Sequence, residues 1–287
     1  MKPAPFAYEC PGSVDEAVAL LASHPGEAKI LAGGQSLVPL LNFRMLRPGL
    51  LVDVNRLSEL DFLEERGDGL RVGALTRHYK LETSPLVRRR LPLLAEAVAH
   101  VGHTAIRNRG TIGGSLAHAD PAAELPMIAV LLDAEIHTRC AAGGRRHRAA
   151  DFFLSPLTTL LGEDEIVSEI VFPDLPPRTG SSFEEVSLRH GDFAIAASAA
   201  TVTATGGTIA SARLAVTGVD AVPRRLTEVE AGLVGQKFSP DLVEVAARQA
   251  RDSVNPGDDL RASADYRRHL VAVLAERVLT DAWARAA

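Results

Sequence analysis

The chain has 287 residues, of which 46% are hydrophobic and 23% charged, a composition typical of a globular protein with two or three packed units. Its formal net charge of -5 argues against a nucleic-acid-binding role, which normally comes with a basic surplus. The only cysteines are Cys10 and Cys140, so we expect no iron–sulfur cluster, metal site or disulfide framework here, and a cytoplasmic location. No apolar run approaches the roughly 20 residues of a membrane helix, and the N-terminus has no apolar signal segment.

The first part of the chain predicts a small α/β unit over residues 1–56. Ser13 and the acidic residues after it indicate a helix start. An apolar strand is expected over 28–31, a short helix over 37–46 and a buried strand over 50–54.

The second part, residues 57–177, predicts a mixed unit that ends in a proline-rich linker. Its expected elements, in chain order, are a hairpin over 60–75 that turns at Gly67-Asp68-Gly69, a helix over 91–101, a helix over 124–132, and strands over 135–140 and 166–172 on either side of a basic turn. Prolines in residues 173–177 cannot continue a helix or a central strand, so this segment is the predicted linker.

The remaining residues, 178–287, predict a separate α+β unit. Antiparallel strands are expected over 183–202 and 212–219, and helices over 242–250 and 266–284. The whole chain is therefore expected to have an α+β fold.

Two glycine-rich loops carry the strongest chemical signal. They are Ala32-Gly33-Gly34-Gln35-Ser36 and Thr111-Ile112-Gly113-Gly114-Ser115. Glycine lets backbone N–H groups approach a phosphate without a Cβ clash, and the hydroxyl and amide side chains beside the glycines add donors. Neither loop has the Rossmann or Walker A spacing, and either glycine pair could be a plain tight turn.

Three segments in the same order resemble the FAD-binding medium subunits of molybdenum hydroxylases, a family that includes carbon monoxide dehydrogenases and xanthine dehydrogenases. They are residues 32–40, residues 106–126 and Arg189-His190-Gly191-Asp192-Phe193-Ala194. The resemblance spans the whole chain. It implies a two-subdomain FAD-binding fold of the vanillyl-alcohol-oxidase type followed by a C-terminal α+β domain.

The resemblance also implies site residues. The backbone of residues 32–36 and 111–115 is expected to hold the FAD pyrophosphate, and Glu124 the adenosine ribose. Asp120 is expected to help, directly or by fixing the loop. Lys29 is expected near the adenosine end, the backbone of Leu161 at the isoalloxazine edge, and Phe193 close to the ring. No catalytic or metal-binding residue is expected in this chain.

Several positions depart from the family pattern or allow a plainer interpretation. Phe193 stands where relatives commonly carry Tyr, Ser115 where Asn or Asp is commoner, and Glu184-Glu185 where a Lys is frequent. Glu124 could simply favour the start of a helix, and Asp120 could form a turn. His103 and His118 lie near the second loop and are expected to pack rather than to act in catalysis.

The family resemblance implies an electron-transfer role. FAD would accept electrons from the two [2Fe-2S] clusters of a small subunit, while a large molybdopterin-binding subunit oxidises the substrate, in a dimer of heterotrimers. The external electron acceptor would be a quinone, NAD or another compound. Two alternatives stay open: a stand-alone FAD-dependent NAD(P)H oxidoreductase of the same fold, and a non-catalytic scaffold whose glycine loops are turns.

Overall fold

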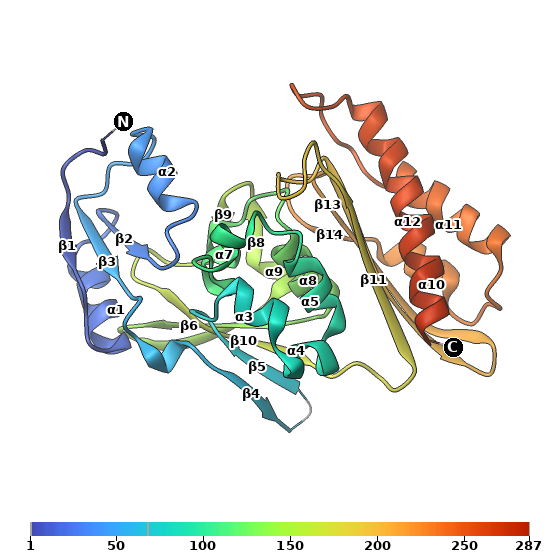
Figure 1. Cartoon of the computed structure of the whole chain (residues 1–287), viewed down its shortest axis with the longest axis horizontal. Helices are drawn as coiled ribbons and strands as arrows, with labels where there is room; N and C mark the ends of the chain where they lie inside the picture. The colour runs from blue at the N-terminus through green and yellow to red at the C-terminus, as the bar shows by residue number, and fades with distance from the viewer. Residues whose placement is uncertain (1, 68, 287) are drawn as a thin grey trace.

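Three sheets follow one another along the molecule in the computed structural model, which describes residues 2–67 and 69–286 (Figure 1). Their strand orders are β1-β3-β2, β4-β5-β10-β6-β7 and β11-β12-β13-β14, and a small hairpin, β8-β9, lies beside the second. In Figure 1 the chain runs from the first sheet at the left to the helices that cover the third at the right.

The first sheet is parallel, and its buried strand lies in the middle. The elements are β1 (Ala7–Glu9), α1 (Val14–Ser23), β2 (Ala28–Leu31), α2 (Leu37–Asn42) and β3 (Leu50–Asp53). Ser13 accepts a hydrogen bond from the backbone of Glu16 at 3.2 Å, which confirms the predicted helix start. The apolar pattern did not predict β1, because its three residues are exposed. The predicted helix over 37–46 is shorter than expected, since the backbone turns left-handed at Arg44 (φ 58°).

The second sheet is antiparallel, with several short helices packed against it. The elements are η1 (Ser58–Leu60), β4 (Leu63–Arg66), β5 (Gly69–Gly73), α3 (His78–Thr83), α4 (Pro85–Arg90), α5 (Pro92–Val98), α6 (Thr104–Arg107), α7 (Ile112–His118), α8 (Glu124–Leu131), β6 (Glu135–Cys140), β7 (Gly143–Arg148), α9 (Ala149–Phe152), β8 (Phe153–Ser155), β9 (Thr158–Thr159) and β10 (Ile166–Pro173).

The expected hairpin, helices and strands of this part are present, with one correction. Strands β4 and β5 pair as expected, and Asp68 of the predicted turn lies outside the described residues. The basic segment after Cys140 is not a turn but the edge strand β7, which pairs with β6. Its arginine side chains are mostly exposed, so no alternation of apolar residues marks the strand in the sequence.

The third sheet lies between two layers of helices. The elements are β11 (Thr179–Val186), β12 (Ala196–Thr205), β13 (Thr208–Thr217), β14 (Arg224–Arg225), α10 (Thr227–Leu233), α11 (Pro240–Asp252) and α12 (Ala264–Ala286). Helix α12 packs on β11 and β12, while α5 and α8 contact the same sheet from the second part of the chain (Figure 1). The strand expected over 183–202 is in fact two strands, and the loop between them contains Phe193.

Small residues let these layers approach closely. Four alanines of β12, at positions 196, 197, 199 and 200, are fully buried. Gly180 of β11 lies so close to the end of α12 that an added Cβ would be 2.0 Å from the carbonyl oxygen of Ala282. Within the described residues, no helix, α12 included, has the length and apolar character needed to cross a membrane.

Replacing Gly180 by Ala should therefore lower stability by about 2 kcal/mol, because the helix must move away from the sheet. The matched control is Gly232→Ala within α10, where the nearest atom to the new methyl group is 3.8 Å away. Alanine is the better helix former, so the control should keep or raise stability. Thermal unfolding of both variants measures the difference, and equal melting temperatures would contradict this packing.

Candidate cofactor site between the glycine loops

The first glycine loop touches the backbone immediately before the second, at Arg109 and Gly110, although about 75 residues separate the two in the sequence. A Cβ added at Gly33 would lie 2.3 Å from the carbonyl oxygen of Arg109 and 2.9 Å from the Cα of Gly110. Only glycine allows this approach of one backbone to the other. The first loop comes directly from β2, and the second begins α7, so two different units of the fold meet at this contact.

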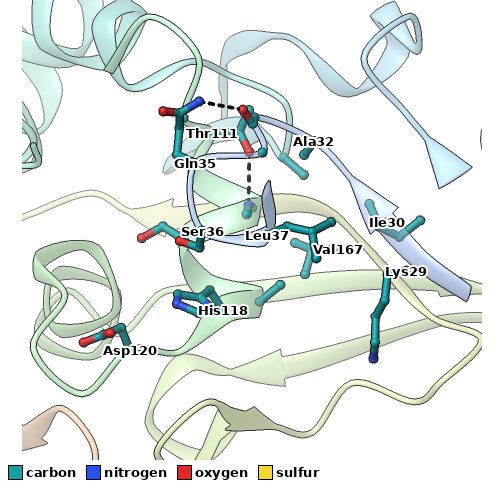
Figure 2. A pocket seen from close by; sticks show the side chains of 18 of the residues that line it. Lys29, Ile30, Ala32, Gln35, Ser36, Leu37, Thr111, His118, Asp120 and Val167 are labelled. Atoms are coloured by element: carbon teal, nitrogen blue, oxygen red, sulfur yellow. Dashed lines mark hydrogen bonds between the residues drawn. The ribbon is translucent and has the colours of Figure 1, made fainter. Parts of the chain in front are cut away.

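A single cavity of about 850 Å³ extends along both loops. All three parts of the chain line it, since Gly191 and Phe193 of the loop between β11 and β12 reach it from the C-terminal part. Figure 2 shows Lys29, Ile30 and Val167 on one side of the first loop, and His118 and Asp120 on the other. The volume lies within the range of cavities that hold small molecules and cofactors.

The backbone N–H groups of the two loops are not equally available. In the second loop, the N–H groups of Ile112 and Gly113 donate to the carbonyl oxygens of Thr76 (3.1 Å) and Ala74 (2.9 Å). The N–H of Gly114 donates to Oγ1 of Thr111 at 3.2 Å (Figure 2). Within the described part of the chain, the N–H groups of residues 33–37 have no hydrogen-bond partner. The first loop is therefore the main source of free backbone donors for an anion.

Some polar side chains of the loops hold the loop structure, and others are left for a ligand. Gln35 bends back and donates from Nε2 to the carbonyl oxygen of Gly33 at 3.0 Å, so its amide shapes the first loop (Figure 2). Thr111 is buried and accepts the bond from Gly114, which leaves its hydroxyl proton free to be donated. Ser36 and Ser115 line the cavity and add hydroxyl groups near the free N–H groups.

Glu124 is a buried acid on the cavity wall. Its exposed fraction is 4%, and it begins α8, a helix that is buried on all sides. Burial, together with the smaller effect of the nearby carboxylates of Glu185 and Asp120, raises the pKa of Glu124 to about 8. A buried carboxyl group gains stability from hydrogen-bond donors, which ribose hydroxyl groups would supply.

Asp120 lies at the turn before α8. Its Oδ1 accepts from the N–H of Ala122 at 2.9 Å, so the side chain fixes the turn as well as lining the cavity. His118 also lines the cavity, and burial lowers its pKa. His103 precedes α6 and is exposed.

The other expected contacts lie on the cavity wall as well. Lys29 is exposed on β2, Leu161 is half-buried, and Phe193 is 45% exposed. The N–H of Leu161 donates to Oγ1 of Thr159 at 3.2 Å, so its carbonyl oxygen is the backbone group left for a ligand. Glu184 and Glu185, the departures from the family pattern, instead contact Arg277 and His100, each at 3.3 Å.

His78 is a cavity residue that the sequence motifs did not identify. The ring is 5% exposed, and neither of its nitrogens has a hydrogen-bond partner in the described structure. Burial lowers the pKa of His78 to about 4, so the ring is neutral near pH 7. No glycine or charge pattern marks this position in the sequence, since the backbone of His78 pairs with Gly110 only in the folded chain.

Together these groups fit FAD. The free N–H groups of residues 33–37 suit a pyrophosphate, and the carboxyl group of Glu124 suits a hydroxyl-rich ribose or ribityl chain. Apolar side chains of Ile30 and Val167 line the cavity beside Lys29, where they suit an aromatic ring (Figure 2).

The raised pKa of Glu124 predicts a pH dependence of stability. The folded chain binds this proton more tightly than the unfolded chain, whose carboxyl group titrates near 4.5, so stability falls as the pH rises from about 4.5 to about 8. Glu124→Gln has no carboxyl group to titrate at this position, so it does not lose this stability as the pH rises. In the FAD-free chain, the melting temperature of the variant relative to the wild type should increase between pH 5 and pH 8.5, and a constant difference would contradict the burial of a proton-binding carboxyl group.

Two family models match nearly the whole chain. Residues 4–175 match the FAD binding domain in molybdopterin dehydrogenase, and residues 181–282 match the CO dehydrogenase flavoprotein C-terminal domain. The 6-hydroxypseudooxynicotine dehydrogenase complex subunit alpha of Paenarthrobacter nicotinovorans is 42% identical, over 100% of this chain and 97% of its own. The carbon monoxide dehydrogenase medium chain of Hydrogenophaga pseudoflava is 38% identical over 100% of both chains.

The fold agrees with these matches. A chain of the Hydrogenophaga pseudoflava carbon monoxide dehydrogenase, solved in a form that lacks the Mo-pyranopterin moiety, superposes with a TM-score of 0.98 at 40% identity over 100% of both chains. The expected two-subdomain FAD-binding fold with a C-terminal α+β domain is thereby confirmed. This chain belongs to the family of FAD-binding medium subunits of molybdenum hydroxylases.

Proposed function

We propose that the FAD of this chain accepts electrons from the [2Fe-2S] clusters of a small partner subunit and passes them to an external acceptor. A large molybdopterin-binding subunit oxidises the substrate in the same complex, which forms a dimer of heterotrimers in the cytoplasm. The acceptor is a quinone, NAD or another compound. Within the chain, we propose residues 1–56 and 57–177 as the FAD-binding subdomains and residues 178–287 as the C-terminal domain.

The observation that carries this proposal is the full-length match to chains of multi-subunit dehydrogenases. The two relatives belong to enzymes named for unlike substrates, 6-hydroxypseudooxynicotine and carbon monoxide. A chain that keeps its length while the named substrate changes is better suited to a step that these enzymes share than to recognition of one substrate. Electron transfer through FAD is such a step, because the flavin supplies the redox chemistry and the protein supplies position and electrostatics.

We propose that other chains of the complex hold the metal centres. With two cysteines in all, the chain cannot supply the four thiolates of one [2Fe-2S] cluster. No group of three or more potential ligands within the described residues could hold a metal ion. This supports a division of labour in which the chain holds FAD alone.

Each part of the cavity then has a role in holding FAD. The N–H groups of residues 33–37 bind the pyrophosphate, supported by the hydroxyl groups of Thr111 and Ser115. Glu124 accepts from ribose hydroxyl groups, and Asp120 fixes the turn before it. Lys29 lies at the adenosine end, the carbonyl oxygen of Leu161 is offered to the flavin, and Phe193 covers the ring. Phe193 has no hydroxyl group, so it excludes water without moving a proton.

The composition of the native complex tests the electron-transfer proposal. The tagged chain, purified from its own organism under mild conditions, should bring down two further chains with about four irons and about one molybdenum per FAD. Metal analysis and flavin absorbance measure these ratios. A chain that purifies alone with FAD, and whose flavin is bleached rapidly by NADH, would instead be a stand-alone oxidoreductase. A chain that purifies without flavin would be a scaffold.

A further inference from the structure

Two polar side chains outside both glycine motifs connect the two loops. Asn55 follows β3, and Arg77 precedes α3. Nδ2 of Asn55 donates to the carbonyl oxygen of Ala32 at 2.8 Å, at the start of the first loop. Nη1 of Arg77 donates to the carbonyl oxygen of Arg109, the group that Gly33 approaches.

The same two side chains bind each other. Nη2 of Arg77 donates to Oδ1 of Asn55 at 2.7 Å. An unbroken chain of hydrogen bonds therefore runs from the carbonyl oxygen of Ala32 through Asn55 and Arg77 to that of Arg109. The planar guanidinium group can donate to both acceptors at once from its fixed fork, which an ammonium group cannot reproduce.

Further contacts fix the orientation of Asn55. Oδ1 of Asp53 accepts from the backbone N–H of Asn55 at 2.9 Å and from its Nδ2 at 2.6 Å. Oδ2 of Asp53 accepts from the hydroxyl group of Tyr8 at 2.5 Å. These bonds require Nδ2 to point toward Asp53 and the first loop, so Oδ1 must face Arg77.

The backbone beside Arg77 supports the second loop in parallel. The carbonyl oxygens of Ala74 and Thr76 accept from the N–H groups of Gly113 and Ile112, and the N–H of His78 donates to Gly110 at 3.0 Å. Segment 74–78 therefore holds the second loop through backbone hydrogen bonds and is linked to the first loop through the side chains of Arg77 and Asn55. The Asn55–Arg77 pair thus connects Ala32 to Arg109 through side-chain hydrogen bonds.

We propose that Asn55 and Arg77 form a positioning clamp that holds the two loops in contact and thereby sets the affinity of the chain for FAD. Neither residue lines the large FAD cavity, so the clamp acts through the loops and not by touching the cofactor. Without it, the loops separate more freely in the FAD-free chain, and binding must pay the entropy of bringing them together. The proposal depends on FAD binding by this chain and not on the partner subunits.

Titration of the full-length, FAD-free chain with FAD tests the clamp. Arg77→Met and Asn55→Leu should each weaken FAD binding roughly tenfold or more, because each removes hydrogen bonds to a loop carbonyl. Both residues belong to one chain of hydrogen bonds. The affinity of the double variant for FAD should therefore be little lower than that of the single variant that binds FAD less tightly. FAD binding by Arg77→Lys should stay weak, because lysine keeps the positive charge but lacks the planar guanidinium group that donates to both acceptors at once.

The matched control is Arg71→Met. Arg71 is also a partly buried arginine of the second unit, but its partners are Glu64 and Glu169 on the sheet, away from the loops. Its removal should leave FAD affinity within about twofold of the wild type, and the melting temperature of the FAD-free clamp variants should fall no further than that of the control. Full affinity in Arg77→Met and Asn55→Leu, or full recovery in Arg77→Lys, would overturn the clamp. Failure of the wild type to bind FAD would contradict the family function instead.

Discussion

The contact of Gly33 with the backbone of Arg109 is the constraint on which the rest of the site depends. It joins a loop of the parallel N-terminal sheet to a loop of the second unit, with no room for even one methyl group between them. Because the loops touch, their free N–H groups and hydroxyl groups face one cavity and not two separate surfaces. A pyrophosphate needs donors gathered in this way, since each backbone N–H alone binds an anion weakly in water.

The contact also explains why the two loops differ in what they offer. The second loop is fastened through its own N–H groups to segment 74–78, so it is a rigid support with few free donors. The first loop keeps its N–H groups at 33–37 free and lies against that support. The second loop supplies rigidity and hydroxyl groups, and the first supplies the free N–H groups. Glu124, at the start of α8, then adds a buried acceptor that suits a neutral, hydroxyl-bearing part of the cofactor.

The sequence predicted those features that depend on local patterns. The helix capped by Ser13, the strand over 28–31 and the hairpin of β4 and β5 were all expected, because caps, apolar runs and turn residues act over a few positions. The glycine motifs and the family resemblance led to FAD. The exposed strands β1 and β7 were missed, since their pairing depends on neighbours distant in sequence and not on an apolar pattern.

Long-range contacts of the site could not be predicted for the same reason. Nothing near Asn55 or Arg77 indicates that their side chains meet between the loops, and His78 becomes a buried, unpaired imidazole only when Gly110 lies over it. Glu124 was expected as a ligand, but its burial, and the raised pKa that follows, depends on the packing of α8. The unequal use of the loop N–H groups is likewise a property of the fold.

The FAD affinity of Gly33→Ala tests the central claim most directly. The added methyl group must push the two loops apart at a cost of about 1–3 kcal/mol, which corresponds to a loss of affinity of roughly 5-fold to 150-fold. Fluorescence titration of the FAD-free full chain measures this, with Gly232→Ala in α10 as the control that adds the same methyl group away from the cavity. The account predicts weak binding in Gly33→Ala and wild-type binding in the control. Wild-type affinity in Gly33→Ala would contradict it, because FAD could then not depend on the contact between the loops.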